Sequence, residues 1–390
     1  MVRPLLTAAL LLSACSASPQ ATNASAAATA TNDSAATNAA TATNASTGES
    51  GALPFAMAKQ GDFDQPFAMA FLPDGRLLVT EKPGKVKLRA VDGKVADVGG
   101  VPKVEFGGQG GLLDIAIAPD FASSHTVYLS YSEPRPRGSS LALARATLDE
   151  TGAPSFKGLH VIWRQGSDGD GGQYGSVIAF SPDGKDLYLS AGERQRLTPA
   201  QDPDQALGKI VRLTLDGAPA PGNPMAAQGG VRAQTWSTGH RNPYGLAFAA
   251  DGRLWETEMG PMGGDELNLI LPGKNYGWPK VSNGDDYDGT PIPDHKAGDG
   301  FEAPKLFWNP SISPGGFMIY SGGMFPAWKG SGFVAALSGE ALVRVTLNGD
   351  SAAKADQWPI GDRVRDVAQA PDGAIWLLED GGPLFRLTPR

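Results

Sequence analysis

The stretch AFLPDGRLLVTE (residues 70–81) is an apolar run, an Asp-Gly turn and a second apolar run. Asp-Gly between apolar runs predicts a β-hairpin, because both residues tolerate the backbone angles of a tight turn. The pattern returns at 117–130, 180–190, 248–256 and 370–378. Several copies continue into another strand and a second turn, as at 209–217, 342–349 and 384–387. This recurrence decides the fold.

The segment Phe325–Gly349 supplies a sixth unit with a divergent first hairpin. One small sheet cannot bury both of its faces, so neighbouring sheets stack around a common axis. The sequence therefore predicts an all-β fold, a six-bladed β-propeller of four-stranded antiparallel blades. Its first and last units have to meet to close the ring. A β-sandwich is the alternative, which the recurrence of a single hairpin pattern disfavours. Loops on one face of a propeller converge on the central channel, where ligands usually bind.

Residues 1–15, MVRPLLTAALLLSAC, have the features of a lipoprotein signal peptide. Arg3 precedes an apolar run too short to span a membrane as a mature helix. The final Leu-Ser-Ala-Cys resembles the bacterial lipobox, in which the cysteine is lipidated and becomes the new N-terminus. Cys15 is the only cysteine, so no intrachain disulfide can form. We expect an exported periplasmic protein with a lipid anchor at Cys15; the alternative is an accidental cysteine in a cleaved leader.

Residues 16–51 consist mainly of Ala, Thr, Asn and Ser. Such a segment buries too little apolar surface to offset its ordering entropy, so it is predicted to be a disordered linker. Residues 52–390 are ample for a large core and form the predicted propeller. The net charge of −8 argues against a nucleic-acid partner, which requires a basic face.

The segment Trp236–Ile270 is the richest in candidate site residues. Arg241 beside Asn242 offers a guanidinium and an amide, which suit a planar acid. The glycine-rich run 260–264 can bring backbone carbonyls close to a ligand or a hard cation. The alternative is a tight loop whose arginine pairs only with Asp265 or Glu266.

Five motifs in this order resemble the soluble PQQ-dependent sugar dehydrogenases, in particular the aldose sugar dehydrogenase (glucose/sorbosone dehydrogenase) family. They are GGQGGLLDIAIAPDF (107–121), GHRNPYGLAF (239–248), EMGPMGGDELNLI (258–270), NYGWP (275–279) and RVRDV (363–367). The resemblance covers nearly the whole predicted propeller. It implies an oxidoreductase that uses PQQ and Ca²⁺, an aldose substrate and an electron acceptor.

The resemblance also implies roles for single residues. Arg241 and Asn242 match the pair that contacts the quinone, and the backbone carbonyls of Gly260 and Pro261 match the ligands of the catalytic Ca²⁺. Further positions contact the cofactor or face the substrate: Gln109, Ser311, Arg363 and Arg365. Hydride would pass from the sugar C1 to PQQ while a base removes the hydroxyl proton.

The chain departs from the family pattern at the general base. The segment GQYGSV (172–177) carries Gln173 where relatives have a histidine, and an amide cannot act as a general base near pH 7. Glu193 stands where relatives have the aspartate that orients this histidine, and we hypothesise that Glu193, or a water that it activates, serves as the base. Ser338 replaces a PQQ-binding lysine of many relatives, so we expect weaker anion binding.

Three functions are compatible with the sequence. The first is a PQQ- and calcium-dependent sugar dehydrogenase that oxidises the C1 hydroxyl to a lactone, with impaired activity. The second is a non-catalytic propeller that binds a carbohydrate, an anion or a protein, which the loss of the base favours. The third is a Ca²⁺-dependent lactone or ester hydrolase, for which the sequence does not clearly provide the carboxylate and asparagine ligands.

Overall fold

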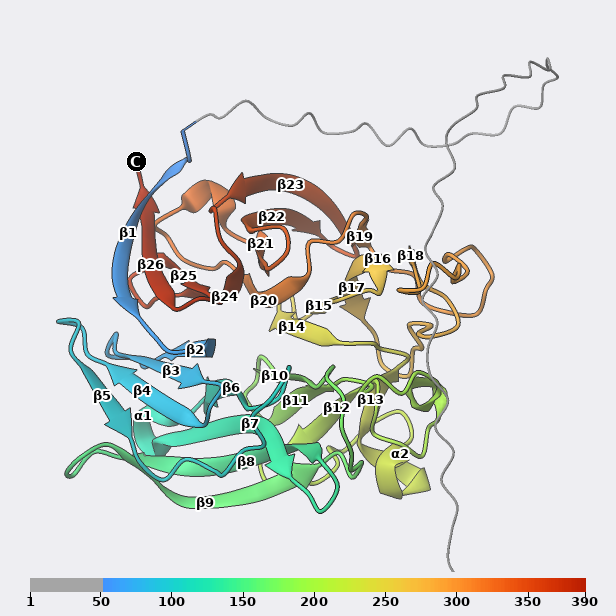
Figure 1. Cartoon of the computed structure of the whole chain (residues 1–390), viewed down its shortest axis with the longest axis horizontal. Helices are drawn as coiled ribbons and strands as arrows, with labels where there is room; N and C mark the ends of the chain where they lie inside the picture. The colour runs from blue at the N-terminus through green and yellow to red at the C-terminus, as the bar shows by residue number, and fades with distance from the viewer. Residues whose placement is uncertain (1–51) are drawn as a thin grey trace, which may run out of the picture. The chain divides into compact units, whose positions relative to one another are not determined.

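Six four-stranded antiparallel sheets are arranged in a ring in the computed structural model, which describes residues 52–390 (Figure 1). The predicted six-bladed β-propeller is confirmed. The predicted signal peptide with Cys15 and the predicted linker 16–51 lie outside the described residues. Among residues 52–390, no helix is long and apolar enough to cross a membrane.

Blades 1 to 3 follow one another along the chain, each beginning with its innermost strand. Blade 1 consists of β2 (Pro66–Phe71), β3 (Leu77–Glu81), β4 (Lys85–Arg89) and β5 (Val95–Val98). Blade 2 consists of β6 (Leu112–Ile117), β7 (Thr126–Pro134), β8 (Ser139–Asp149) and β9 (Ser155–Arg164). Blade 3 consists of β10 (Gly175–Phe180), β11 (Asp186–Ala191), β12 (Lys209–Thr214) and β13 (Thr235–Thr238).

Blades 4 and 5 continue the same order, and blade 6 combines both ends of the described chain. Blade 4 consists of β14 (Pro243–Phe248), β15 (Leu254–Glu258), β17 (Asp265–Ile270) and β19 (Leu306–Trp308). Blade 5 consists of β20 (Pro314–Ile319), β21 (Gly332–Ala336), β22 (Ala341–Asn348) and β23 (Ser351–Pro359). Blade 6 consists of β24 (Val364–Gln369), β25 (Ile375–Glu379), β26 (Pro383–Pro389) and β1 (Phe55–Asp62). The short strands β16 (Met262–Gly263) and β18 (Gly284–Asp285) pair with each other.

The ring closes through strand β1, which pairs antiparallel with β26 and forms the outer edge of blade 6. In Figure 1 the blue β1 lies beside the red β26. The expectation that the first and last units meet is therefore correct.

The recurring Asp-Gly turns have one geometry. In the β2–β3 turn the Asp74 carboxylate accepts the N–H of Arg76 at 3.1 Å, and in the β14–β15 turn Asp251 does the same for Arg253 at 3.1 Å. The glycine that follows Asp74 has a φ of +88°, a conformation that other residues rarely adopt. The sequence motif therefore repeats because blades 1, 3, 4 and 6 use this turn between their first two strands. Blades 2 and 5 join these strands through the short helix α1 (Phe121–Ser124) and the 3₁₀ turn Pro326–Trp328.

The innermost strands of the six blades surround a central channel with a cavity of about 190 Å³. Each of them has a register shift in its pairing with the next strand, and such bulges turn side chains towards a site. Two channel aspartates join neighbouring blades: Asp114 accepts the N–H of Ile178 at 2.7 Å, and Asp366 accepts that of Met69 at 2.9 Å. Burial raises the pKa of Asp114 to about 6, and burial together with Asp114 raises that of Asp366 to about 7.

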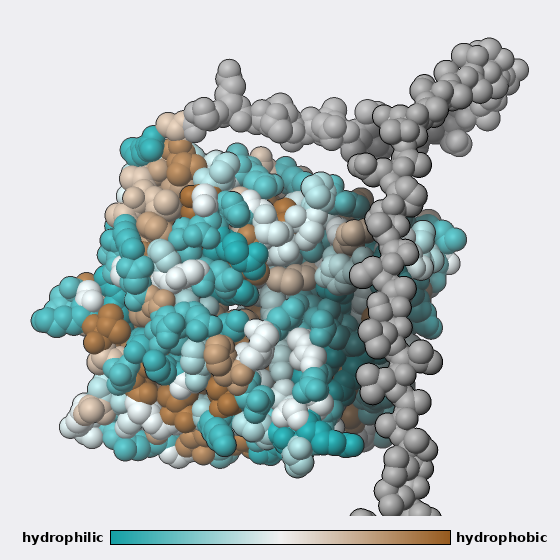
Figure 2. All heavy atoms as spheres, viewed as in Figure 1, coloured by the Kyte–Doolittle hydropathy of each residue, from teal (hydrophilic) through white to brown (hydrophobic). Residues whose placement is uncertain are grey.

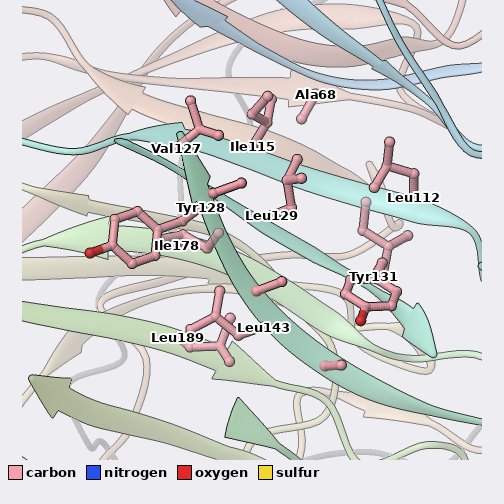
Figure 3. Packing of buried hydrophobic residues seen from close by; sticks show 14 of the residues in the cluster. Ala68, Leu112, Ile115, Val127, Tyr128, Leu129, Tyr131, Leu143, Ile178 and Leu189 are labelled. Carbon is pink, nitrogen blue, oxygen red and sulfur yellow. The ribbon is translucent and has the colours of Figure 1, made fainter. Parts of the chain in front are cut away.

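Apolar side chains fill the space between blades. Figure 3 shows this packing around blades 1 to 3, where Leu129 and Leu189 are fully buried with their neighbours. Burying one such side chain contributes about 1.5–3 kcal/mol. Hydrophilic residues cover much of the face seen in Figure 2. The core therefore fixes the blades, and the loops at their ends are free to carry a site.

Candidate active site

The candidate site lies on the face opposite the Asp-Gly hairpins, where innermost strands begin and second strands end. The long connections that hold the candidate residues all join strands on this face: 106–112, 166–176, 192–208, 239–244, 260–266, 308–316 and 363–366. Segments far apart in the chain thus meet at one mouth of the channel.

Arg241 is held at this mouth by a hydrogen bond from its backbone N–H and by two aromatic rings. The carboxylate of Glu258 accepts the N–H of Arg241 at 2.6 Å and that of Asn242 at 3.2 Å. The guanidinium carbon lies 5.1 Å from the ring centre of Trp278 and 5.7 Å from that of Tyr287. Such contacts are favourable for a cation and fix the plane of the guanidinium group.

The guanidinium of Arg241 contacts backbone carbonyls. Its Nη1 donates to the Gly260 oxygen at 2.6 Å and to the Met259 oxygen at 3.0 Å. The alternative in which Arg241 pairs with Asp265 or Glu266 is therefore wrong. A Cβ atom on Gly260 would lie 2.3 Å from the Gly263 oxygen, so only glycine fits here.

Asp265 holds this loop from the inside. Its fully buried carboxylate accepts the Gly260 N–H at 2.9 Å, the Ser311 hydroxyl at 2.6 Å, and the N–H groups of Ile312 and Ser313 at 2.7 Å. Burial raises the pKa of Asp265, while these hydrogen bonds oppose the rise. The Ser311 hydroxyl is thus directed to Asp265, and Ser313 is the serine that lines the mouth.

Gln173, where the resemblance implies a histidine, lies between the Glu193 carboxyl group and the Arg241 guanidinium. In the amide orientation that satisfies both neighbours, its oxygen accepts from Arg241 Nη2 at 2.9 Å and its nitrogen donates to Glu193. The backbone N–H groups of Arg196 and Leu197 donate to the other oxygen of Glu193. Burial raises the pKa of the Glu193 carboxyl, although these N–H groups and Arg241 oppose the rise.

A cationic hollow of about 300 Å³ lies beside Met259. Arg363 and Arg365 line it, and both donate to Asp380, Arg363 Nε at 3.1 Å and Arg365 Nε at 2.8 Å. Burial opposes ionisation of Asp380, but the two arginines lower its pKa below the ordinary value. The fourth charged group of the hollow is Lys82.

Gln109 separates this hollow from a second, outer one of about 400 Å³. Its oxygen accepts the Gln173 N–H at 2.6 Å, which links the glycine-rich loop 107–111 to the position of the expected base. The outer hollow is lined by the half-exposed ring of Phe106 and the polar groups of Asp170 and Gln195. An aromatic ring among polar groups is a surface suited to a sugar.

A buried acidic cluster supports the site from behind. Glu256, Glu258 and Glu266 surround the amide of Asn268, which donates to all three at 3.0–3.4 Å. Burial first, and repulsion from Glu258 second, raise the pKa values of Glu256 and Glu266 well above the ordinary range. Glu258, whose carboxylate holds the backbone N–H groups of Arg241 and Asn242, also lies 3.3 Å from Nδ1 of His240.

Comparison with known proteins identifies the family. A family model described as Glucose / Sorbosone dehydrogenase matches residues 63–386. The chain belongs to this family. It is 37% identical over 345 residues to the aldose sugar dehydrogenase YliI of Escherichia coli, covering 85% of this chain and 92% of that protein. It is 27% identical over 422 residues to quinoprotein glucose dehydrogenase B of Acinetobacter calcoaceticus, covering 84% and 87%.

Among solved structures, the PQQ-bound form of an aldose sugar dehydrogenase from Streptomyces coelicolor aligns with a TM-score of 0.72 and 31% identity. The alignment covers 86% of this chain and 98% of that one. By family the protein is an enzyme of the oxidoreductase class.

The structure brings most of the predicted site residues of this family member together. One group surrounds Arg241: Gln109, Gln173, Glu193, Asn242 and Gly260, with the buried Pro261 directly after the last. A second group, Arg363 and Arg365, lines the cationic hollow, which Met259 also lines. Asn242 is turned to Met259, with 3.6 Å between its amide nitrogen and the sulfur.

Sequence reasoning missed Lys82, although a signal was present. The residue directly after the second strand of a blade lines the cationic hollow in blades 1, 4, 5 and 6: Lys82, Met259, Leu337 and Asp380. The repeat that revealed the fold therefore also marks a ring of mouth residues. The role of Asp265 had no such signal, because three of its four partners lie 46–48 residues away.

Proposed function

We propose that the protein is a PQQ- and Ca²⁺-dependent aldose sugar dehydrogenase that oxidises the C1 hydroxyl of a sugar to a lactone, with a slow chemical step. The observation that carries the proposal is the convergence on one mouth of the Arg241–Gly260 pair and the cationic hollow. Family membership and the relatives named as PQQ enzymes support it.

The residues present fit both groups. The Gly260 carbonyl already accepts from a cation, the Arg241 guanidinium, at 2.6 Å, and such oxygens are ligands that Ca²⁺ prefers. The buried Nε of Arg241 makes no hydrogen bond within residues 52–390, so this guanidinium keeps a donor for a further acceptor. Arg363 and Arg365 present guanidinium groups to carboxylates. We assign the ion to Gly260 and Pro261, and the quinone acid to the arginines and Asn242.

When bound, PQQ supplies the two-electron acceptor for the hydride of C1. Gln109 and Gln173 are placed to bind the sugar hydroxyls, and the outer hollow gives the sugar a path to them. Glu193 has no exposed surface, so the hydroxyl proton reaches it only through a water or past Gln173. A base that is reached indirectly is a poor one, and this is our reason for a slow chemical step.

Reconstitution tests the proposal. The apo protein is titrated with PQQ and Ca²⁺, the quinone absorbance is followed, and dye reduction is measured with several aldoses. We expect saturable binding and slow, sugar-dependent reduction. The variant Glu193→Gln is expected to lose this reduction and keep the binding. Unchanged turnover in Glu193→Gln would refute the role of this carboxylate.

A second function is favoured by the neutral amide of Gln173, which lies between Glu193 and Arg241 where the resemblance implies a histidine base. In that case the propeller binds a carbohydrate or an anion without oxidising it. Binding of PQQ without reduction by any aldose supports this function. Absence of PQQ binding argues against both of these functions.

The N-terminal sequence adds a proposal on location. We propose that the chain is exported and lipidated at Cys15, which would tether the propeller to a periplasmic membrane surface. Fractionation tests this: the wild type should sediment with membranes, and Cys15→Ser should be released. An equal distribution of both would contradict the anchor.

A further inference from the structure

Lys82 occupies a position that repeats around the propeller. It directly follows β3, as Met259 follows β15, Leu337 follows β21 and Asp380 follows β25, and all four line the cationic hollow. The backbone at Lys82 is fixed on both sides. Its N–H donates to the Gln65 oxygen at 2.9 Å, and its oxygen accepts from Leu112 at 2.9 Å. The side chain therefore starts from a rigid point directed at the mouth.

The charges of the hollow do not balance. Three of its lining side chains are cations, Lys82, Arg363 and Arg365, and one is an anion, Asp380. Asp380 is already shared by both arginines. Within residues 52–390, the Lys82 ammonium donates to a neutral group, the Gly108 oxygen, at 3.2 Å.

This excess positive charge is costly for the ligand-free fold. Burial first, and Arg365 second, lower the pKa of Lys82, while Asp380 opposes the change. Cations that repel one another in a hollow create a positive potential there, and an anion with several carboxylates relieves it.

We propose that Lys82 is a cofactor-binding residue whose ammonium group pairs with a carboxylate of the quinone. The proposal rests on the function proposed above. It also bears on Ser338, a position that the resemblance matches to a PQQ-binding lysine. Ser338 follows Leu337 at the edge of the same hollow and donates to the Ser313 hydroxyl oxygen at 2.8 Å. Blade 1 then provides the positive charge that blade 5 lacks.

A purely structural role is the competing explanation, since Lys82 also contacts the glycine-rich loop through Gly108. The two roles differ in their dependence on charge and salt. A loop brace made by one hydrogen bond from the ammonium to a neutral carbonyl depends little on ionic strength, whereas an ion pair with a carboxylate weakens as salt rises. The experiment therefore measures PQQ binding and its salt dependence, in addition to activity.

The test titrates wild type, Lys82→Gln, Lys82→Arg and the control Lys85→Gln with PQQ in the presence of Ca²⁺. Lys85 is exposed at the start of the neighbouring strand β4 and carries the same charge. Binding is followed by quinone absorbance at low and high salt, and thermal unfolding checks the fold. We expect Lys82→Gln to raise the dissociation constant about 10- to 100-fold and to flatten its salt dependence. Lys82→Arg should retain most of the affinity.

Each outcome decides the question. If wild type binds PQQ and Lys82→Gln binds equally well, this inference is overturned while the proposed function stands. If Lys82→Gln weakens binding equally at all salt concentrations, Lys82 is a loop brace and the inference is overturned. If wild type binds no PQQ at all, the proposed function fails and the inference fails with it.

Discussion

Placing a titratable base at residue 173, where the resemblance implies a histidine, is the sharpest test of the site. Gln173 is 5% exposed and has a φ of +52°, a left-handed conformation that histidine adopts more readily than most residues. Its amide joins Glu193 to Arg241. In Gln173→His, one imidazole nitrogen can still donate to Glu193, and the other becomes a base that faces the mouth.

The expected gain follows from the two neighbours. Glu193 favours the protonated imidazole, and Arg241, whose Nη2 lies 2.9 Å from the present Gln173 oxygen, favours the neutral form. Because the two influences oppose each other, we expect a pKa near the ordinary histidine value of about 6.5. Most molecules then carry a neutral base at pH 7.5. A positioned general base contributes about 10²–10⁴-fold, so kcat should rise about 100-fold or more.

The assay is dye reduction by glucose with protein reconstituted with PQQ and Ca²⁺, measured from pH 5 to 9. The variant should show a loss of rate on the acid side of about pH 6.5, which wild type lacks. Gln65→His is the matched control, because Gln65 is exposed and also has a left-handed φ, +49°. If Gln173→His binds PQQ like wild type and turns over within threefold of it, the reasoning about this position is refuted.

Three further predictions concern the frame of the site. Replacing Asp265 by Ala leaves the buried donors of its loop and of residues 311–313 unpaired, and each unpaired donor costs about 1–3 kcal/mol. Denaturant titration should therefore show a free energy of unfolding that is lower by about 3 kcal/mol or more. A decrease on the order of less than 1 kcal/mol would contradict this role of Asp265. In Gly316→Ala the new Cβ would lie 1.9 Å from the Asp366 carboxylate, and we expect the free energy of unfolding to fall by about 1–3 kcal/mol. The control Gly323→Ala should lose almost no stability, because no atom lies within 4 Å of the added Cβ. Equal losses in the two variants would show that the channel relaxes freely. Because the folded-state pKa of Asp366 is raised from 3.8 to about 7, the folded protein holds this proton more tightly than the unfolded chain and loses stability as pH rises from about 4 to about 7. Urea unfolding at pH 5 and 8 should show a loss on the order of 2 kcal/mol that is smaller in Asp366→Asn, and identical slopes would rule this carboxyl out as the cause.

The fold could be predicted because its unit is local. An Asp-Gly turn between apolar strands needs contacts only a few residues apart, such as that between Asp74 and Arg76, and four of the six blades repeat it. The other two blades keep the same pattern of strands with a different connection. The number of blades follows from counting these units. The sequence predicts that the first and last units must meet, but it does not identify the strands that pair, because the partner of β1 lies at the far end of the described chain.

The site could be predicted in part. The resemblance carries residue identities, so it placed Arg241, Gln173 and Glu193 in one cluster, where the structure brings them together. It does not carry side-chain directions. Ser311, expected at the cofactor, is turned to Asp265 because the two are joined across 46 residues by a bond that no local pattern reveals. Lys82 escaped notice because its importance depends on the charges of blade 6.

The geometry also separates binding from chemistry. The cationic hollow is lined by residues that directly follow the second strands of blades 1, 4, 5 and 6, whereas Gln173 and Glu193 lie on loops at the start and end of the first two strands of blade 3. A change at the base therefore leaves the charges of the hollow in place. Repulsion among those charges destabilises the ligand-free protein, and a bound anion relieves it. PQQ should therefore stabilise the protein whether or not a sugar is oxidised. At a concentration 100 times its dissociation constant, the gain is about 2.7 kcal/mol. An upward thermal shift with PQQ in Glu193→Gln, equal to that of wild type, would show that the two halves of the site are independent.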